Sequence, residues 1–221
     1  MCPTILETME LFVMMLLRAF ALSVAPLGLA AAVLPAPAIA QGQNGLAAVQ
    51  AHLRAVTSMT ANFSQTDRRG RAMNGTLSLK RPGKIRFEYR GARMLVVADG
   101  QRLNFLDYEV GQRQSWPIAD SPLSVLLDPN RDLARFATVV RNDANTLMIE
   151  ARDPRRREFG RITLAFAKVA GAPGGLSLQG WNTLDAQNNL TQVRLSGQRF
   201  NVPVADSVFR FQPPQGRGPR R

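Results

Sequence analysis

Twelve short stretches of alternating apolar and polar residues constrain the fold of this 221-residue chain more than any other feature. In KIRFEYR, the residues Ile85, Phe87 and Tyr89 alternate with charged residues, which is the pattern of a strand with one buried and one exposed face. Sequences rich in Gly, Pro and Asx, such as RPG, DGQ and GAPGG, separate the stretches and are typical of turns. The predicted strands are 59–66, 72–80, 84–90, 94–98, 102–107, 112–116, 139–141, 147–151, 161–167, 176–183, 190–199 and 208–211.

Two helical segments accompany the strands. The apolar positions of NGLAAVQAHLRAV (44–56) fall on one side of a helix. A second helix is expected in DSPLSVLLDP, where Ser121 can cap, Pro122 suits the first helical position and Pro129 ends the helix; RDLARF adds a further turn.

The areas of these elements predict a curled sheet. Ten or more antiparallel strands about 4.8 Å apart make a sheet roughly 50 Å wide. Two helices about 10 Å across cover only about 20 Å of it. The sheet must therefore curl onto itself, and its concave face is either a filled core or the wall of an apolar cavity. The pattern alone leaves both open.

The N-terminus has the features of a secretory signal peptide. An uncharged apolar run at 19–34 follows Arg18, two prolines end it, and Ala38 and Ala40 form a small-x-small cleavage pattern. We predict a signal peptide at 1–40, one domain at 41–212 and a basic, flexible tail at 213–221. An uncleaved membrane anchor at 11–34 is the alternative.

Residues at the extreme N-terminus bear on the start and the compartment. Glu7 and Glu10 suit a signal peptide poorly, so translation is also compatible with a start at Met14 or Met15. The only cysteine is Cys2, which precedes the apolar run. The exported chain then has no cysteine and must be held together by packing alone.

The charge balance restricts the partners. The formal net charge is +12, and nearly all of the basic residues are arginines. Such a chain attracts nucleic acid, anionic lipid or acidic proteins. Because an exported protein rarely meets nucleic acid, we expect no nucleic-acid partner and favour the other two, with ordinary solvated charge as the alternative.

Residues for catalysis are scarce. His52 is the only histidine and has no metal-ligating neighbour at helical spacing, so a zinc site or a His-based triad is not expected. There is no Gly-x-Ser-x-Gly sequence, and most aspartates fall where turns need them. We predict a protein that is not an enzyme, with no catalytic residue, no metal and no cofactor. An exported hydrolase with an unrecognised site is the competing class.

Several local sequences together resemble the LolA family of outer-membrane lipoprotein carriers. These are MTANFSQ, GTLSLKRPGKIRFEY, LVVADGQRL and DSVFRFQPPQG, which occur in this order between 46 and 216. The resemblance implies an unclosed antiparallel β-barrel, mainly β, lidded by a few helices around a hydrophobic cavity. It implies a periplasmic carrier that takes acylated lipoproteins from an inner-membrane ABC transporter to an outer-membrane acceptor, acting as a monomer. A lipid- or glycolipid-binding or regulatory module of the same fold is the alternative.

The resemblance also assigns roles to residues. Arg81 of KRP matches the arginine that holds the lid, with helix carbonyls near Leu53 among its expected partners. Ile85 and Phe87 match the acyl-facing side of the next strand. The expected cavity lining is Ile85, Phe87, Leu79, Phe105, Leu164 and Leu53.

Overall fold

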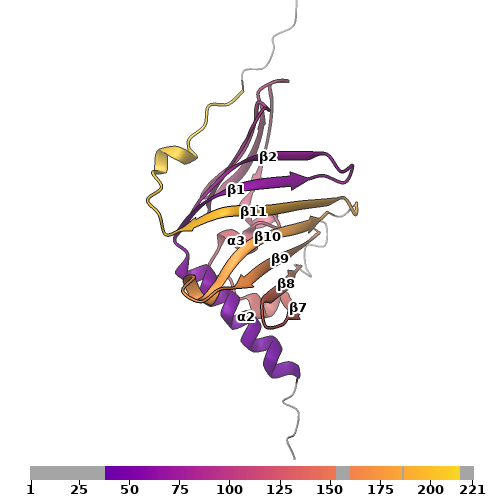
Figure 1. Cartoon of the computed structure of the whole chain (residues 1–221). Coiled ribbons are helices and arrows are strands. Elements are labelled where there is room, and N and C mark those ends of the chain that lie inside the picture. The colour runs from indigo at the N-terminus through magenta and orange to yellow at the C-terminus, as the bar shows by residue number, and fades with distance from the viewer. Residues whose placement is uncertain (1–37, 153–159, 186, 215–221) are drawn as a thin grey trace, which may run out of the picture. The chain divides into compact units, whose positions relative to one another are not determined.

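The alternating segments pair in one antiparallel sheet of eleven strands. The computed structural model describes residues 38–152, 160–185 and 187–214. The sheet order is β6-β5-β4-β3-β2-β1-β11-β10-β9-β8-β7, so β1 and β11 lie at its centre (Figure 1). The strands are β1 (Ser58–Thr66), β2 (Ala72–Lys80), β3 (Lys84–Tyr89), β4 (Met94–Asp99), β5 (Arg102–Asp107), β6 (Gln112–Pro117), β7 (Ala137–Asn142), β8 (Thr146–Ala151), β9 (Arg161–Lys168), β10 (Leu176–Leu184) and β11 (Leu190–Phe200).

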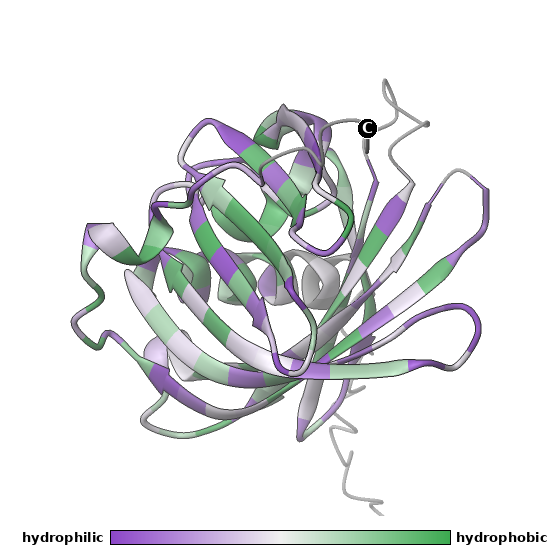
Figure 2. Ribbon diagram, turned by 90° about the horizontal axis from the view of Figure 1, so that it is seen from above, coloured by the Kyte–Doolittle hydropathy of each residue, from purple (hydrophilic) through white to green (hydrophobic). Residues whose placement is uncertain are grey.

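The sheet curls but does not close, because β6 and β7 are its two ends and do not pair with each other. Apolar and polar residues alternate along the strands (Figure 2), and the apolar ones form the main core inside the curl. The predicted fold, a mainly β, unclosed antiparallel barrel, is confirmed.

Helix α2 (Ala38–Ala55) packs on the half of the sheet that contains β7 and β10. It buries Val49 and Leu53 completely. The C-terminal end of α2 lies against the short helix η4 (Pro173–Gly175). A Cβ on Gly174 would come within 2.7 Å of the His52 backbone nitrogen. This helix begins before the segment predicted from its apolar positions.

A lid segment, residues 118–136, connects the two edge strands. It contains η1 (Ile118–Asp120), α3 (Ser124–Leu127) and η2 (Leu133–Arg135). The helix predicted after Ser121 is therefore only four residues long. The Ser121 hydroxyl accepts a hydrogen bond from the Leu123 amide (3.2 Å), and Pro129 follows the last turn.

The predicted twelfth strand, 208–211, is wrong. This segment forms the short helix η5 (Asp206–Phe209) and then extended backbone, packed outside the sheet over Leu95, Val97 and Leu106. The carbonyls of Val208 and Arg210 accept hydrogen bonds from the Arg86 guanidinium (3.2 and 3.3 Å) rather than from a neighbouring strand.

The chain termini are described only in part. The predicted signal peptide lies outside the described residues except for its last three, which begin α2, and the predicted basic tail lies outside them after Pro214. Within the described ranges, no helix has the length and hydropathy needed to cross a membrane.

Candidate functional site

The strand register defines two ends of the curled sheet. We call the first the rim; it carries the hairpin turns 67–71, 90–93, 108–111 and 185–189. The other, the helix end, carries the turns 81–83, 100–101 and 169–175. The C-terminal end of α2 lies at this end of the sheet, against η4.

A cavity of about 540 Å³ lies inside the curl and reaches the rim. This volume is typical of sites for small ligands. Aromatic and aliphatic side chains make up most of its wall, polar residues gather at the rim, and three residues of the lid segment complete it. The lining residues are Gln65, Asp67, Arg71, Met73, Phe87, Tyr89, Met94, Val96, Leu103, Phe105, Trp116, Ser121, Pro122, Leu123, Trp181, Thr183, Leu184, Asp185, Thr191 and Val193.

Edge-to-face aromatic contacts shape the wall. The Phe87 ring packs against Phe63 and Trp181, with centroids 5.3 and 5.9 Å apart, and Phe63 also packs against Tyr89 at 5.1 Å. Burial raises the pKa of the Tyr89 phenol to about 12, so it stays protonated and donates to Gln65 Oε1 (2.8 Å). The aromatic part of the wall therefore carries no charge, and the charged lining residues Asp67, Arg71 and Asp185 lie at the rim.

The predicted lining residues divide into two groups. Phe87 and Phe105 line the cavity. The other four, which are 1% exposed or less, lie in the packed core beneath it: Ile85, Leu79, Leu164 and Leu53. The interior is therefore filled towards the helix end and hollow towards the rim. The sequence left open a filled core or an apolar cavity, and the interior contains both.

Arg81 reaches a helix carbonyl, but on α3 rather than near Leu53. Its Nη1 donates to Leu126 O at 2.8 Å, and the Gly83 amide donates to Leu127 O at 3.2 Å. A short helix leaves its last carbonyls without helical partners. The turn between β2 and β3 therefore caps the C-terminal end of α3 from two positions.

The Arg81 guanidinium is costly to bury. Its Nε is buried without a hydrogen-bond partner. Burial lowers the pKa of Arg81 to about 10, and the nearby charge of Asp128 opposes that shift. Arg81 is still charged at neutral pH, and its hydrogen bond to Leu126 is charge-assisted.

His52 is a buried contact of α2. Its Nδ1 lies 2.7 Å from Pro173 O, and its ring packs edge-on against Phe166 and Phe200. Burial lowers the pKa of His52, with the Arg81 charge acting in the same direction. A neutral ring that donates to η4 fits these surroundings. Among the described residues, no group of three or more His, Cys, Asp or Glu could hold a metal.

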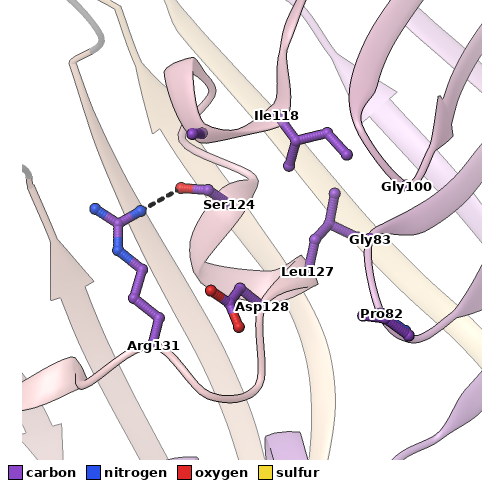
Figure 3. A pocket seen from close by; sticks show the side chains of 9 residues that line it. Pro82, Gly83, Gly100, Ile118, Ser124, Leu127, Asp128 and Arg131 are labelled. Atoms are coloured by element: carbon purple, nitrogen blue, oxygen red, sulfur yellow. Dashed lines mark hydrogen bonds between the residues drawn. The ribbon is translucent and has the colours of Figure 1, made fainter.

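A second hollow of about 490 Å³ lies beside α3 (Figure 3). Pro82, Gly83 and Gly100 line it from the sheet, and Ser124 and Leu127 line it from α3. Arg131 Nη1 donates to the Ser124 hydroxyl at its edge (2.6 Å). The lid segment thus lines both hollows, with Ser121 and Leu123 in the rim cavity and Ser124 and Leu127 in the second one.

Trp181 is a wall residue that the alternation did not predict. Counting every second residue from Leu176 and Leu178 places Trp181 on the outer face. The register shifts between Leu178 and Gly180, where Gly180 has a φ of +148°, and this turns Trp181 inward. The glycine in LSLQGWNTL was the only sequence signal of this bulge.

Comparison with known proteins identifies the family. Residues 54–212 match the family model described as outer membrane lipoprotein carrier protein LolA. The chain belongs to the LolA family. Two relatives, both named outer-membrane lipoprotein carrier protein, come from Dechloromonas aromatica and Legionella pneumophila (strain Corby). They are 29% and 26% identical to this chain, over 74% and 79% of it and 81% and 88% of their own lengths.

A solved structure, the LolA superfamily protein NE2245 from Nitrosomonas europaea, superposes with a TM-score of 0.44 at 10% identity. The match covers 76% of this chain and 97% of that one. Within the LolA family, the cavity at the rim of this chain is the candidate binding site.

Proposed function

We propose that this LolA-family protein carries lipoproteins across the periplasm, from the inner to the outer membrane, with their acyl chains in the rim cavity. The observation that carries the proposal is the aromatic and aliphatic wall of that cavity, which opens beside a polar rim. Phe87 and Phe105 are the wall residues on which we expect acyl chains to lie.

Transfer energetics explain why a carrier is needed. Exposing one methylene group to water costs about 0.8 kcal/mol, so an acyl chain does not leave a membrane unassisted. A cavity must lower that cost and still release the chain. A carrier with a competing closed state meets both needs, because the closed state lowers its apparent affinity.

The lid segment supplies such a closed state. Arg81 and Gly83 bind the carbonyls at the end of α3, while Pro122 and Leu123 occupy part of the cavity wall. We propose that acyl chains displace this segment toward the second hollow and break the Arg81 bond. Reforming that bond would then assist release.

The partners follow from the same role. We propose that an ABC transporter in the inner membrane loads the carrier, and that an acceptor protein or the outer membrane itself receives the cargo. The carrier acts as a monomer, and a signal peptide at 1–40, cleaved after Ala40, exports it to the periplasm. The remaining core residues Leu79, Ile85, Leu164 and Leu53 would support the wall without touching the cargo.

A photo-crosslinking experiment in living cells tests the function. A benzophenone amino acid at Phe105 would react with whatever occupies the cavity, whereas the same group at Val140, 53% exposed on edge strand β7, provides the control. We expect adducts with acylated proteins from Phe105 and not from Val140. Adducts with lipid or glycolipid alone would support the lipid-binding alternative and refute the lipoprotein role.

A further inference from the structure

We propose that the rim is a docking surface for anionic membrane lipid, a conclusion that rests on the proposed carrier function. Among the described residues, several exposed arginines lie in the turns and at the strand ends around the mouth of the cavity, and six of them carry the argument. They are Arg68, Arg69, Arg71, Arg90, Arg93 and Arg152.

The basic side chains at the two ends of the sheet differ in how many partners they have within the protein. The chain has three lysines, and all lie at the helix end, bonded to other groups: Lys84 and Lys80 to Asp206 (2.7 and 3.1 Å), and Lys168 to Asn142. At the rim, Arg69, Arg90 and Arg93 make no side-chain hydrogen bond or ion pair with another described residue. Their guanidinium groups are therefore available to an external partner.

Most of the described rim carboxylates form no close ion pair with these arginines. Asp67, Asp107 and Asp185 each accept hydrogen bonds from backbone amides of their own turns. Among the described residues of the rim, Arg71 forms an ion pair with Asp67 at 2.7 Å, and Arg161 lies 3.7 Å from Glu150. These acidic side chains stabilise the turns and keep their own charge. The six arginines still outnumber the four carboxylates of the described rim turns, Asp67, Asp107, Glu109 and Asp185, so the rim keeps a net positive charge.

Exposed apolar side chains favour a membrane over an acidic protein. Val110 is 61% exposed and Leu190 is 38% exposed, and both belong to the rim. A lipid interface accepts apolar side chains and arginines together, because guanidinium groups bind phosphate in a bidentate manner while apolar side chains enter the hydrocarbon boundary. Docking in this orientation would turn the cavity mouth toward the leaflet that holds the acyl chains.

Vesicle flotation tests the proposal with the purified protein. The probes are phosphatidylcholine vesicles and vesicles in which one third of the lipid is phosphatidylglycerol. Each surface arginine contributes about a fivefold gain in affinity for an anionic bilayer at moderate salt. We expect binding to the anionic vesicles to exceed binding to the neutral ones by more than about tenfold and to weaken as salt is added.

Two variants with the same change in net charge separate the rim from general basicity. The rim variant reverses four charges: Arg68→Glu, Arg69→Glu, Arg90→Glu and Arg93→Glu. The control variant reverses four exposed arginines away from the rim: Arg54→Glu, Arg194→Glu, Arg199→Glu and Arg210→Glu.

We expect the rim variant to bind anionic vesicles no better than neutral ones, and the control variant to keep most of its preference. Equal loss in both variants, or unchanged binding by the rim variant, would overturn the proposal. If the rim variant lost cargo transfer but kept vesicle binding, the rim would serve a protein partner instead, which also refutes it.

Uptake of a fluorescent fatty acid by the same proteins keeps the two proposals separate. All three proteins should take up the probe, because the reversed charges lie outside the apolar wall. If none takes it up, the carrier function fails whatever the vesicles show. If all take it up while the rim variant binds anionic vesicles normally, only the docking surface fails.

Discussion

Replacing Arg81 by leucine should loosen α3 without lowering the stability of the sheet. The substitution removes the 2.8 Å bond from Nη1 to Leu126 O and leaves the Gly83–Leu127 bond in place. A hydrogen bond to a charged group contributes about 1.5–3 kcal/mol. The equilibrium for local opening of α3 should therefore rise by about 10- to 150-fold.

Global stability should change by no more than about 1 kcal/mol, since a leucine avoids the cost of burying a guanidinium whose Nε has no partner. Hydrogen exchange separates the two effects. The amides of Leu126, Leu127 and Asp128 donate within this turn, at 2.9 to 3.0 Å, and should lose protection. Strand amides and the urea midpoint should stay almost unchanged.

Arg86→Leu is the matched control. Arg86 also donates to backbone carbonyls, but on the outer face, where it holds Val208 and Arg210. Its replacement should expose the amides of the C-terminal segment and leave α3 protected. In a two-step transfer assay, Arg81→Leu should load normally or better and release slowly. Unchanged protection at Leu126 to Asp128, or weakened loading with normal release, would refute the lid mechanism.

Further substitutions test the site and its support. Phe105→Glu should abolish fatty-acid uptake with little loss of stability, because this side chain lines the cavity; retained uptake would exclude that wall. Ile85→Glu should cost about 3 kcal/mol or more in urea unfolding, because the side chain is 0% exposed in packed core; a small cost would mean that the core is hollow there. Because burial lowers the pKa of His52, the unfolded chain binds the proton first, and unfolding free energy should decrease as the pH falls below about 6.5. The decrease should be absent in His52→Gln, and an identical pH profile would show that another group titrates. Gly174→Ala should lower the melting temperature, since its φ is +64° and a Cβ would meet the backbone of α2; an unchanged melting temperature would contradict that contact.

The sequence predicted the sheet well because alternation reports which face of a strand is buried. It failed for 208–211, where VFRF alternates in the same way but lies outside the sheet. The backbone carbonyls there accept hydrogen bonds from the Arg86 side chain, which lies more than a hundred residues away in the sequence. Local patterning carries no information about such a partner.

The site was predicted less completely. An inward-facing side chain lines the cavity when it lies near the rim end of its strand, and it lies in the core when it is near the helix end. Which of the two applies depends on the side chains that pack at the helix end, and these come from other parts of the chain. Ile85 and Phe87 share a face two residues apart, yet only Phe87 reaches the cavity. The inward orientation of Trp181 could not be predicted without the bulge at Gly180. The hydrogen-bond acceptor of Arg81 could not be predicted without the position of α3. That position depends on how the lid segment connects the two edge strands.

Native mass spectrometry of the protein purified from its own periplasm tests the central claim most directly, because it weighs whatever the cavity holds. We predict a population whose mass equals one carrier plus one acylated lipoprotein, and we predict that Phe105→Glu abolishes it. A protein recovered only with phospholipid or glycolipid, or with the same bound mass in Phe105→Glu, would contradict the claim that this cavity carries the acyl chains of lipoproteins.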